Sequence, residues 1–148
     1  MKTVNIIPLI KNAISLLEPS FKKHQVKYIA KIDSETLHLK ADNIQLTQII
    51  FNLIINAIYY SKPNDLIVIE LTETEHNMCL KISDQGEGVP AENIDKVFQP
   101  FFTTKPVGEG SGLGLSVVHG IVTSHKGSIT VENNTPQGAT FIINLPKL

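Results

Sequence analysis

The chain has 148 residues, of which 42% are hydrophobic and 18% charged, with a formal net charge of −1 and one cysteine. These values describe a globular chain long enough to bury a core, and they exclude a disordered segment and a dedicated nucleic-acid surface. The single cysteine excludes an internal disulfide framework, and no apolar run reaches membrane-spanning length. We therefore expect one cytoplasmic domain over residues 1–148, without direct membrane contact.

The N-terminal part of the chain predicts a helix followed by two strands. Residues 3–7 are extended and lead through Pro8 into a helix over residues 9–23, where apolar side chains recur at helical spacing. Residues 26–32 alternate between apolar and polar side chains and predict a strand, and residues 36–40 predict another. No segment recurs along the chain, which excludes a repeat architecture.

The strongest helix pattern begins at Asp42. This residue and Gln45 resemble a capping box, and an apolar run then continues to Ser61. Beyond it we expect strands at residues 66–73, 77–84, 128–133 and 139–146, one helical turn within 92–98, and a helix over 113–125 that ends near Gly127. About three helices and about five strands without regular alternation favour an α+β two-layer sandwich, with the helices on one face of a mixed, mainly antiparallel sheet.

Two asparagines on the long helix are candidates for a binding site. Asn52 and Asn56 are four residues apart and share one helix face, which Gln48 extends by a turn. The rest of this helix is apolar nearly all round, so we expect it to be buried, where an unpaired carboxamide costs about 1–3 kcal/mol. Pairing with nearby backbone would explain one such asparagine, whereas two at this spacing favour a shared polar ligand.

Asp84 follows a predicted strand and opens the stretch DQGEG. An aspartate followed two residues later by glycine is often only a turn. The functional alternative is a carboxylate at a strand end that accepts a hydrogen bond from a ligand, such as the exocyclic amine of adenine. Gly86 and Gly88 would then let the backbone approach a flat ring. Taken alone, this stretch leaves both alternatives open.

Glycines dominate the stretch from Lys105 to Ser116, immediately before the predicted third helix. Free N–H groups and the positive end of a helix would favour an anion at this point, whereas a flexible linker is the alternative. The patterns G-x-x-x-x-G-K-[ST] and G-x-G-x-x-G are both absent. A Walker phosphate loop and a dinucleotide fingerprint are therefore excluded, and any phosphate site here is of another kind.

Five short motifs follow one another along the chain: NLIINA at 52–57, DQGEGVP at 84–90, VFQPFFTTKP at 97–106, GSGLGL at 110–115 and QGATFIINLP at 137–146. Together they resemble the N, G1, F and G2 boxes and the closing strand of the ATP-binding catalytic domain of two-component sensor histidine kinases. This domain belongs to the GHKL superfamily, shared with gyrase-type ATPases, and has the Bergerat ATP-binding fold. The resemblance covers the chain from about Val4 to Pro146.

The resemblance implies that the ligand is ATP with Mg²⁺, and it implies a role for each matching residue. Asn56 would bind Mg²⁺ through its amide oxygen, and Asn52 would orient phosphate or metal-bound water. Asp84 would read the amine of adenine, Lys105 would face the phosphates, and Phe98 would anchor the base of an ATP lid. Asn52, Asn56 and Lys105 would be the catalytic residues. The other residues placed around the nucleotide are Tyr60, Gly86, Gly88, Val89, Thr104, Gly110, Ser111, Gly112, Leu113, Gly114, Leu115 and Thr140.

The residue at position 52 bears on the reaction. ATP-hydrolysing relatives resemble one another in having a glutamate there as general base, whereas the amide of Asn52 cannot accept a proton near neutral pH. The sequence therefore favours transfer of the γ-phosphate to a histidine, with a stand-alone ATPase as the alternative. Tyr59 stands where many sensor kinases have a basic residue that can contact a phosphate. A non-catalytic nucleotide-sensing module therefore remains a further alternative.

The resemblance also implies partners. The phosphoacceptor of the family is a histidine followed by an acidic residue on a separate helical-hairpin domain, and none of the five histidines here precedes an acidic residue. We therefore expect the acceptor domain to lie outside residues 1–148, and little phosphorylation without it. The downstream partner would be the receiver domain of a response regulator. The chain would be cytoplasmic, or the cytoplasmic part of a membrane-bound sensor.

Overall fold

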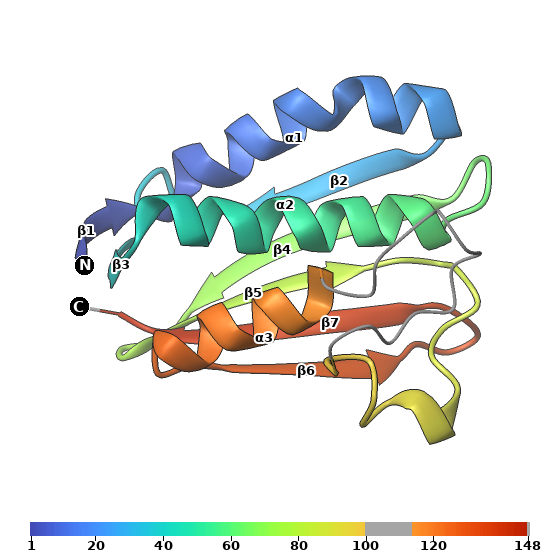
Figure 1. The fold of residues 1–148 in the computed structure, drawn as a ribbon. Coiled ribbons are helices and arrows are strands. Elements are labelled where there is room, and N and C mark those ends of the chain that lie inside the picture. The colour runs from blue at the N-terminus through green and yellow to red at the C-terminus, as the bar shows by residue number, and fades with distance from the viewer. Residues whose placement is uncertain (100–113, 148) are drawn as a thin grey trace.

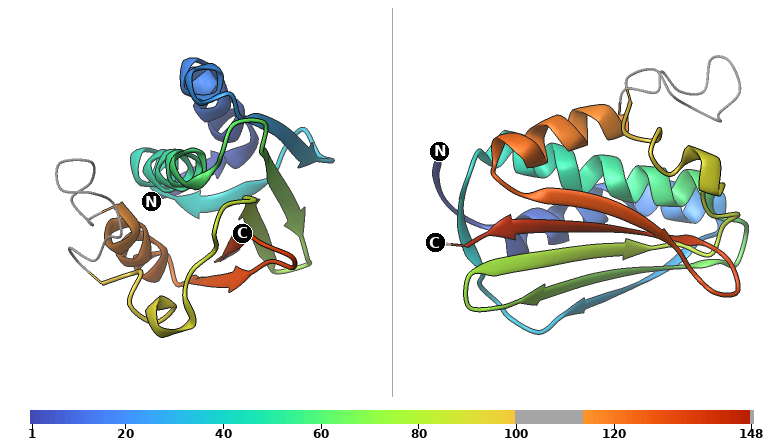
Figure 2. Two further views of the ribbon diagram at one scale, coloured as in Figure 1. Left: turned by 90° about the vertical axis from the view of Figure 1, so that its right-hand side faces the viewer. Right: turned by 90° about the horizontal axis from the view of Figure 1, so that it is seen from below.

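The structure is a computed structural model that describes residues 1–99 and 114–147. Within these ranges, three α-helices lie on one face of a five-stranded sheet (Figure 1; Figure 2), which confirms the predicted α+β sandwich. None of these helices is long and apolar enough to cross a membrane. The helices are α1 (Ile6–His24), α2 (Asn43–Tyr60) and α3 (Gly114–Ser124), with a 3₁₀ turn η1 (Ala91–Asn93). The strands are β1 (Lys2–Asn5), β2 (Lys27–Ile32), β3 (His38–Ala41), β4 (Leu66–Glu73), β5 (Asn77–Ser83), β6 (Ser128–Asn133) and β7 (Ala139–Pro146).

The large sheet has the strand order β2-β4-β5-β7-β6. β2 and β4 are parallel and every other neighbouring pair is antiparallel, so the sheet is mixed and mainly antiparallel, as expected. β1 and β3 do not join it, because they pair antiparallel with each other as a separate two-stranded sheet. β7 comes last along the chain but lies in the interior of the sheet, where it forms one wall of the site described below.

The hydrophobic core lies between the helices and the inner face of the sheet. Alternate residues of each strand point inward, as Ile67, Ile69 and Leu71 of β4 do. α2 packs between α1 and α3 (Figure 2), which explains why it is apolar on most sides. Its buried apolar residues are Leu46, Ile49, Ile50, Leu53, Ile54, Ala57 and Ile58. Neighbours on several sides therefore fix the position of the polar residues that α2 carries.

Two polar contacts hold the start of α2. The side chain of Asp42 accepts a hydrogen bond from the N–H of Gln45 at 2.9 Å, which confirms the predicted cap. The N–H of Asp42 donates to Nε2 of His125 at 3.1 Å, a contact that the sequence did not predict. Because Nε2 accepts here, Nδ1 carries the proton and donates to the carbonyl of Ile121 at 2.8 Å. The buried His125 therefore ties the end of α3 to the start of α2.

α3 ends near Gly127, as expected. The left-handed residue is Lys126, with a φ of 62°, and the N–H of Gly127 donates to the carbonyl of Val122 at 2.9 Å. This is the Schellman arrangement, with the glycine one residue beyond the left-handed position. Gly127 is required for space, because a Cβ there would collide with the carbonyl oxygen of Asn144 on β7.

Candidate functional site

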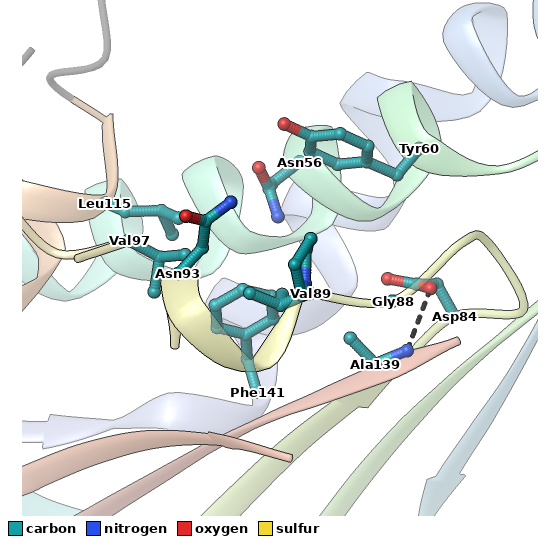
Figure 3. A pocket seen from close by; sticks show the side chains of 11 residues that line it. Asn56, Tyr60, Asp84, Gly88, Val89, Asn93, Val97, Leu115, Ala139 and Phe141 are labelled. Carbon is teal, nitrogen blue, oxygen red and sulfur yellow. Dashed lines mark hydrogen bonds between the residues drawn. The ribbon is translucent and has the colours of Figure 1, made fainter. Parts of the chain in front are cut away.

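A pocket opens between the C-terminal half of α2, the segment that follows β5, and the inner face of β7 (Figure 3). The space it encloses is about 480 Å³ when the part open to solvent is included. Its walls are mostly apolar, with a few polar side chains directed inward. It is lined by Asn56, Tyr60, Asp84, Gly88, Val89, Pro90, Asn93, Val97, Leu115, Ala139 and Phe141.

Asp84 is the acidic group of the pocket and is only 5% exposed. Its Oδ1 accepts hydrogen bonds from the N–H of Gly86 at 3.0 Å and from the N–H of Ala139 at 3.1 Å. Its Oδ2 has no hydrogen-bond partner within the described residues and faces the pocket (Figure 3). Burial raises the pKa of this carboxyl and the nearby Asp65 adds to the rise, while the two N–H bonds oppose it. Among the described residues, Asp84 thus presents an oriented acceptor atom to the pocket.

α2 supplies a second polar wall. Asn56 is 9% exposed as a residue, its carboxamide points toward the pocket (Figure 3), and it makes no hydrogen bond to any described residue. Tyr60 lies one turn further on and also lines the pocket, and its ring meets that of Tyr59 edge-on with the centroids 5.0 Å apart. Asn52 lies one turn before Asn56, half-buried and outside the pocket lining. A nearly buried carboxamide without an internal partner indicates a position for a polar ligand.

Two glycines let the loop after β5 pass close to its neighbours. Gly88 has a φ of +79°, and a Cβ there would lie 2.8 Å from Oδ1 of Asn133. A Cβ on Gly86 would collide with the carbonyl oxygen of Tyr60 at the end of α2. The loop that presents Asp84 is therefore packed tightly against both the helix and the hairpin that form the pocket.

The structure brings together several residues that were expected around a nucleotide. Gly86, Gly114 and Asn52 lie outside the pocket lining, and Gly114 is exposed at the start of α3. The expected residues that do line the pocket are Asn56, Tyr60, Asp84, Gly88, Val89 and Leu115. The expected residues that lie outside the described ranges are Thr104, Lys105, Gly110, Ser111, Gly112 and Leu113.

Thr140 does not line the pocket. It lies on the opposite face of the sheet, where its hydroxyl is 2.8 Å from Oγ of Ser83 and donates to Oδ1 of Asn134 at 2.6 Å. Its neighbour Ala139 faces the pocket instead. The alternation of apolar residues along the last strand could have shown that Ala139, and not Thr140, faces the pocket. The lining residues that the sequence did not single out are Pro90, Asn93, Val97, Ala139 and Phe141.

Comparison with known proteins identifies the family. Residues 41–148 match the family described as histidine kinase-, DNA gyrase B-, and HSP90-like ATPases. The chain belongs to this ATPase family. It is 32% identical over 146 residues to the sensor histidine kinase ZraS of Escherichia coli (strain K12), an alignment that covers 99% of this chain and 31% of ZraS. The chain thus spans less than a third of the length of this relative.

Solved structures of this ATPase family have the same fold. The catalytic domain of the histidine kinase ThkA, in a nucleotide-free form, matches with a TM-score of 0.89 and 31% identity over 99% of each chain. ThkA in complex with the response regulator protein TrrA matches with a TM-score of 0.86 and 30% identity, over 99% of this chain and 42% of that chain. The expected kinship with histidine-kinase catalytic domains is confirmed.

One aromatic residue of this ATPase-family domain connects the segment after η1 to the rest of the fold. The ring of Phe98 stacks on His119 of α3 with centroids 5.7 Å apart, and it meets Phe141 of β7 edge-on at 6.2 Å. Phe98 therefore packs the segment that follows η1 against α3 and β7. Its expected role at the base of a lid concerns residues outside the described ranges.

Proposed function

We propose that the chain is the ATP-binding catalytic domain of a protein-histidine kinase, which binds Mg-ATP and donates the γ-phosphate to a histidine on a separate domain. The observation that carries the proposal is the orientation of Asp84, whose Oδ1 is held by two backbone N–H groups while Oδ2 faces an apolar pocket. Membership of the ATPase family and the likeness to ThkA support it. Because the chain spans only part of its curated relatives, the proposal concerns one domain of such an enzyme.

The base end of the pocket suits adenine. A purine ring would lie among the apolar side chains of Val89, Val97 and Phe141, with its exocyclic amine directed toward Oδ2 of Asp84. An ionised carboxylate only accepts hydrogen bonds, so it selects a base that presents a donor at this edge. Guanine presents a carbonyl oxygen there and would leave a buried carboxylate unpaired, which is a strong basis for discrimination.

The phosphate end of the pocket lies toward α2. Asn56 is the residue that would hold Mg²⁺, because its carboxamide oxygen is a ligand of the kind this ion takes and has no partner among the described residues. A bound Mg²⁺ supplies charge neutralisation for the triphosphate. We also propose that Lys105 and Thr104 contact the phosphates and that the glycines of 110–114 offer backbone N–H groups to them. Residues 104–113 lie outside the described ranges.

Asn52 favours phosphoryl transfer over hydrolysis. It lies on α2 one turn before Asn56, where the ATP-hydrolysing relatives have a glutamate as general base. A carboxamide cannot take a proton from water near neutral pH. The imidazole of a histidine is already nucleophilic when neutral, so the domain would contribute placement of the phosphate and neutralisation of its charge.

The proposed partners follow from the same reaction. The acceptor would be a helical-hairpin domain that carries a histidine, and phosphate would then pass to the receiver domain of a response regulator. The complex of ThkA with TrrA is one between a histidine kinase and a response regulator, which supports this order. We propose a cytoplasmic location, either alone or as the cytoplasmic part of a membrane-bound sensor.

Two measurements test the proposal. Isothermal titration calorimetry should show that the purified chain binds ATP more tightly with Mg²⁺ than without it, and Asn56→Ala should remove most of that gain. Labelled ATP should then phosphorylate a histidine when the cognate acceptor domain is added. Appreciable turnover without an acceptor would identify an ATPase instead, and binding without transfer would identify a nucleotide sensor. A chain that does not bind ATP refutes the proposal.

A further inference from the structure

The turn between β6 and β7 is bonded to the loop that carries Asp84. We call residues 84–89 the base loop and residues 133–138 the hairpin turn. Side chains of the turn bind backbone groups at both ends of the base loop, although the two segments are far apart in the sequence. The contacts are Asn133 with both backbone groups of Val89, Nδ2 of Asn134 with the carbonyl of Asp84 at 3.2 Å, and Nε2 of Gln137 with the carbonyl of Gln85 at 3.0 Å.

Asn133 makes the shortest of these contacts. Its Oδ1 accepts a hydrogen bond from the N–H of Val89 at 2.7 Å, and its Nδ2 donates to the carbonyl of Val89 at 2.7 Å. One carboxamide thus pairs with both polar backbone groups of a single residue, as a neighbouring strand does. The same Oδ1 lies 2.8 Å from the place where a Cβ of Gly88 would be. The base loop is therefore held directly against this amide.

The hairpin holds the base loop at two separate points. At the first end, the N–H of Asp84 donates to the carbonyl of Ala139 at 2.9 Å, and the N–H of Ala139 donates to Oδ1 of Asp84. At the second end, Asn133 holds Val89, which lines the pocket. Gly88, in the left-handed region, lies between the two points and would otherwise let the Val89 end move. The hairpin consequently sets the spacing between Asp84 and Val89.

We infer that Asn133 is a positioning residue for nucleotide recognition, which acts through Val89 and keeps the base pocket at the width that lets Asp84 meet an adenine amine. The inference rests on the proposed function, because it takes the base to be adenine. Asn133 is exposed and lies outside both the pocket lining and the core. Removing its amide should therefore leave the fold intact and weaken the binding of ATP.

Two substitutions of Asn133 and one control separate the loss of its hydrogen bonds from the effect of an added charge. Asn133→Ala removes both bonds without adding charge, and Asn133→Asp keeps the acceptor but sets a carboxylate against the carbonyl of Val89. The control is Asn144→Asp on β7, which makes the same change in charge at an exposed side chain that has no hydrogen bond within the described residues. Affinity for ATP and for GTP is measured by calorimetry, with circular dichroism to confirm that each variant is folded.

Both Asn133 variants should bind ATP about three- to tenfold more weakly, the loss that corresponds to one net hydrogen bond, and GTP should be affected less. In the nucleotide-free protein, hydrogen exchange at the N–H of Val89 should accelerate in Asn133→Ala and stay unchanged in Asn144→Asp. Unchanged ATP affinity in both Asn133 variants, or an equal loss in the control, overturns the inference. A wild-type chain that does not bind ATP refutes the proposed function instead, and the exchange experiment still tests the contact.

Discussion

Asp84→Asn is the substitution that tests the site most directly, because it changes one atom of the pocket and little else. The amide oxygen of an asparagine can still accept the N–H groups of Gly86 and Ala139, which now bond to Oδ1 at 3.0 and 3.1 Å. The other terminal atom, which faces the pocket, changes from an acceptor to a donor of hydrogen bonds. The loop should keep its conformation while the chemistry that it presents to a ligand is inverted.

The expected loss of affinity follows from this inversion. A hydrogen bond to a charged acceptor contributes about 1.5–3 kcal/mol, which corresponds to about 10- to 150-fold in the dissociation constant of ATP. Stability should change in the opposite sense. Burial raises the pKa of Asp84 in the folded state, so the contribution of this carboxyl to stability is greatest below its ordinary pKa of 3.8 and falls as the pH rises through the higher folded value. At neutral pH the buried, charged carboxyl of Asp84 therefore lowers the stability of the fold, and an uncharged asparagine avoids this desolvation cost.

Calorimetry with Mg-ATP and thermal unfolding at neutral pH measure the two quantities on the same samples. Asp95→Asn is the matched control, because it makes the same chemical change at an exposed residue just beyond η1 that has no hydrogen bond within the described residues. We expect Asp84→Asn to unfold at or above the temperature of the wild type and to bind ATP about 10- to 150-fold more weakly. A variant that binds ATP within about threefold of the wild type would show that Asp84 does not contact the base.

Four further outcomes are expected. Gly86→Ala should weaken ATP binding about tenfold or more, because its Cβ would collide with the carbonyl of Tyr60 and displace the loop that carries Asp84. An unchanged dissociation constant would contradict the close packing of this loop against α2. Gly120→Ala lies in α3, where a new Cβ would meet no described atom within 4 Å beyond its chain neighbours and its own helix backbone; it should instead raise stability by about 0.5–1 kcal/mol in urea unfolding and leave affinity unchanged. Asp42→Ala should cost about 1 kcal/mol of stability through the lost cap of α2, again without affecting affinity. The affinity for ATP, followed by fluorescence, should fall as the pH decreases from about 7 to about 4. The midpoint of the fall should lie above the ordinary pKa of aspartate, because the raised pKa of Asp84 means that its carboxyl becomes protonated at a higher pH.

Local patterns predicted the elements of the fold well, whereas contacts between distant residues escaped them. Asp42 and the apolar run after it defined α2 because a cap and a helical period are both local signals. The pairing of β1 with β3 as a separate sheet depends on which strands meet, which the sequence pattern does not record. The end of α3 near Gly127 was predicted from the glycine, whereas the spatial need for that glycine, the approach of Asn144, is a contact between distant residues.

The candidate site was predictable where motifs carried it and unpredictable where the tertiary fold completed it. Asn56 and Asp84 were found through helix spacing and a motif, and both line the pocket. Asn93 and Val97 lie in a segment for which a helical turn was predicted, but no local pattern shows that the tertiary fold brings both to the pocket. Thr140, expected from the resemblance, lies one residue from the lining residue Ala139, and neighbouring residues of a strand lie on opposite faces of the sheet.

The interior place of β7 has a consequence for how the protein is made. This strand comes last along the chain, yet it supplies Ala139, which fixes Asp84, and Phe141, which lines the pocket. Its pairing with β5 joins residues as distant as Asn77 and Pro146, so the β5–β7 contacts are all long-range in sequence. A chain still emerging from the ribosome before residue 139 therefore has no complete base pocket. A site built on Asp84 and Phe141 is therefore complete only once β7 has paired with β5.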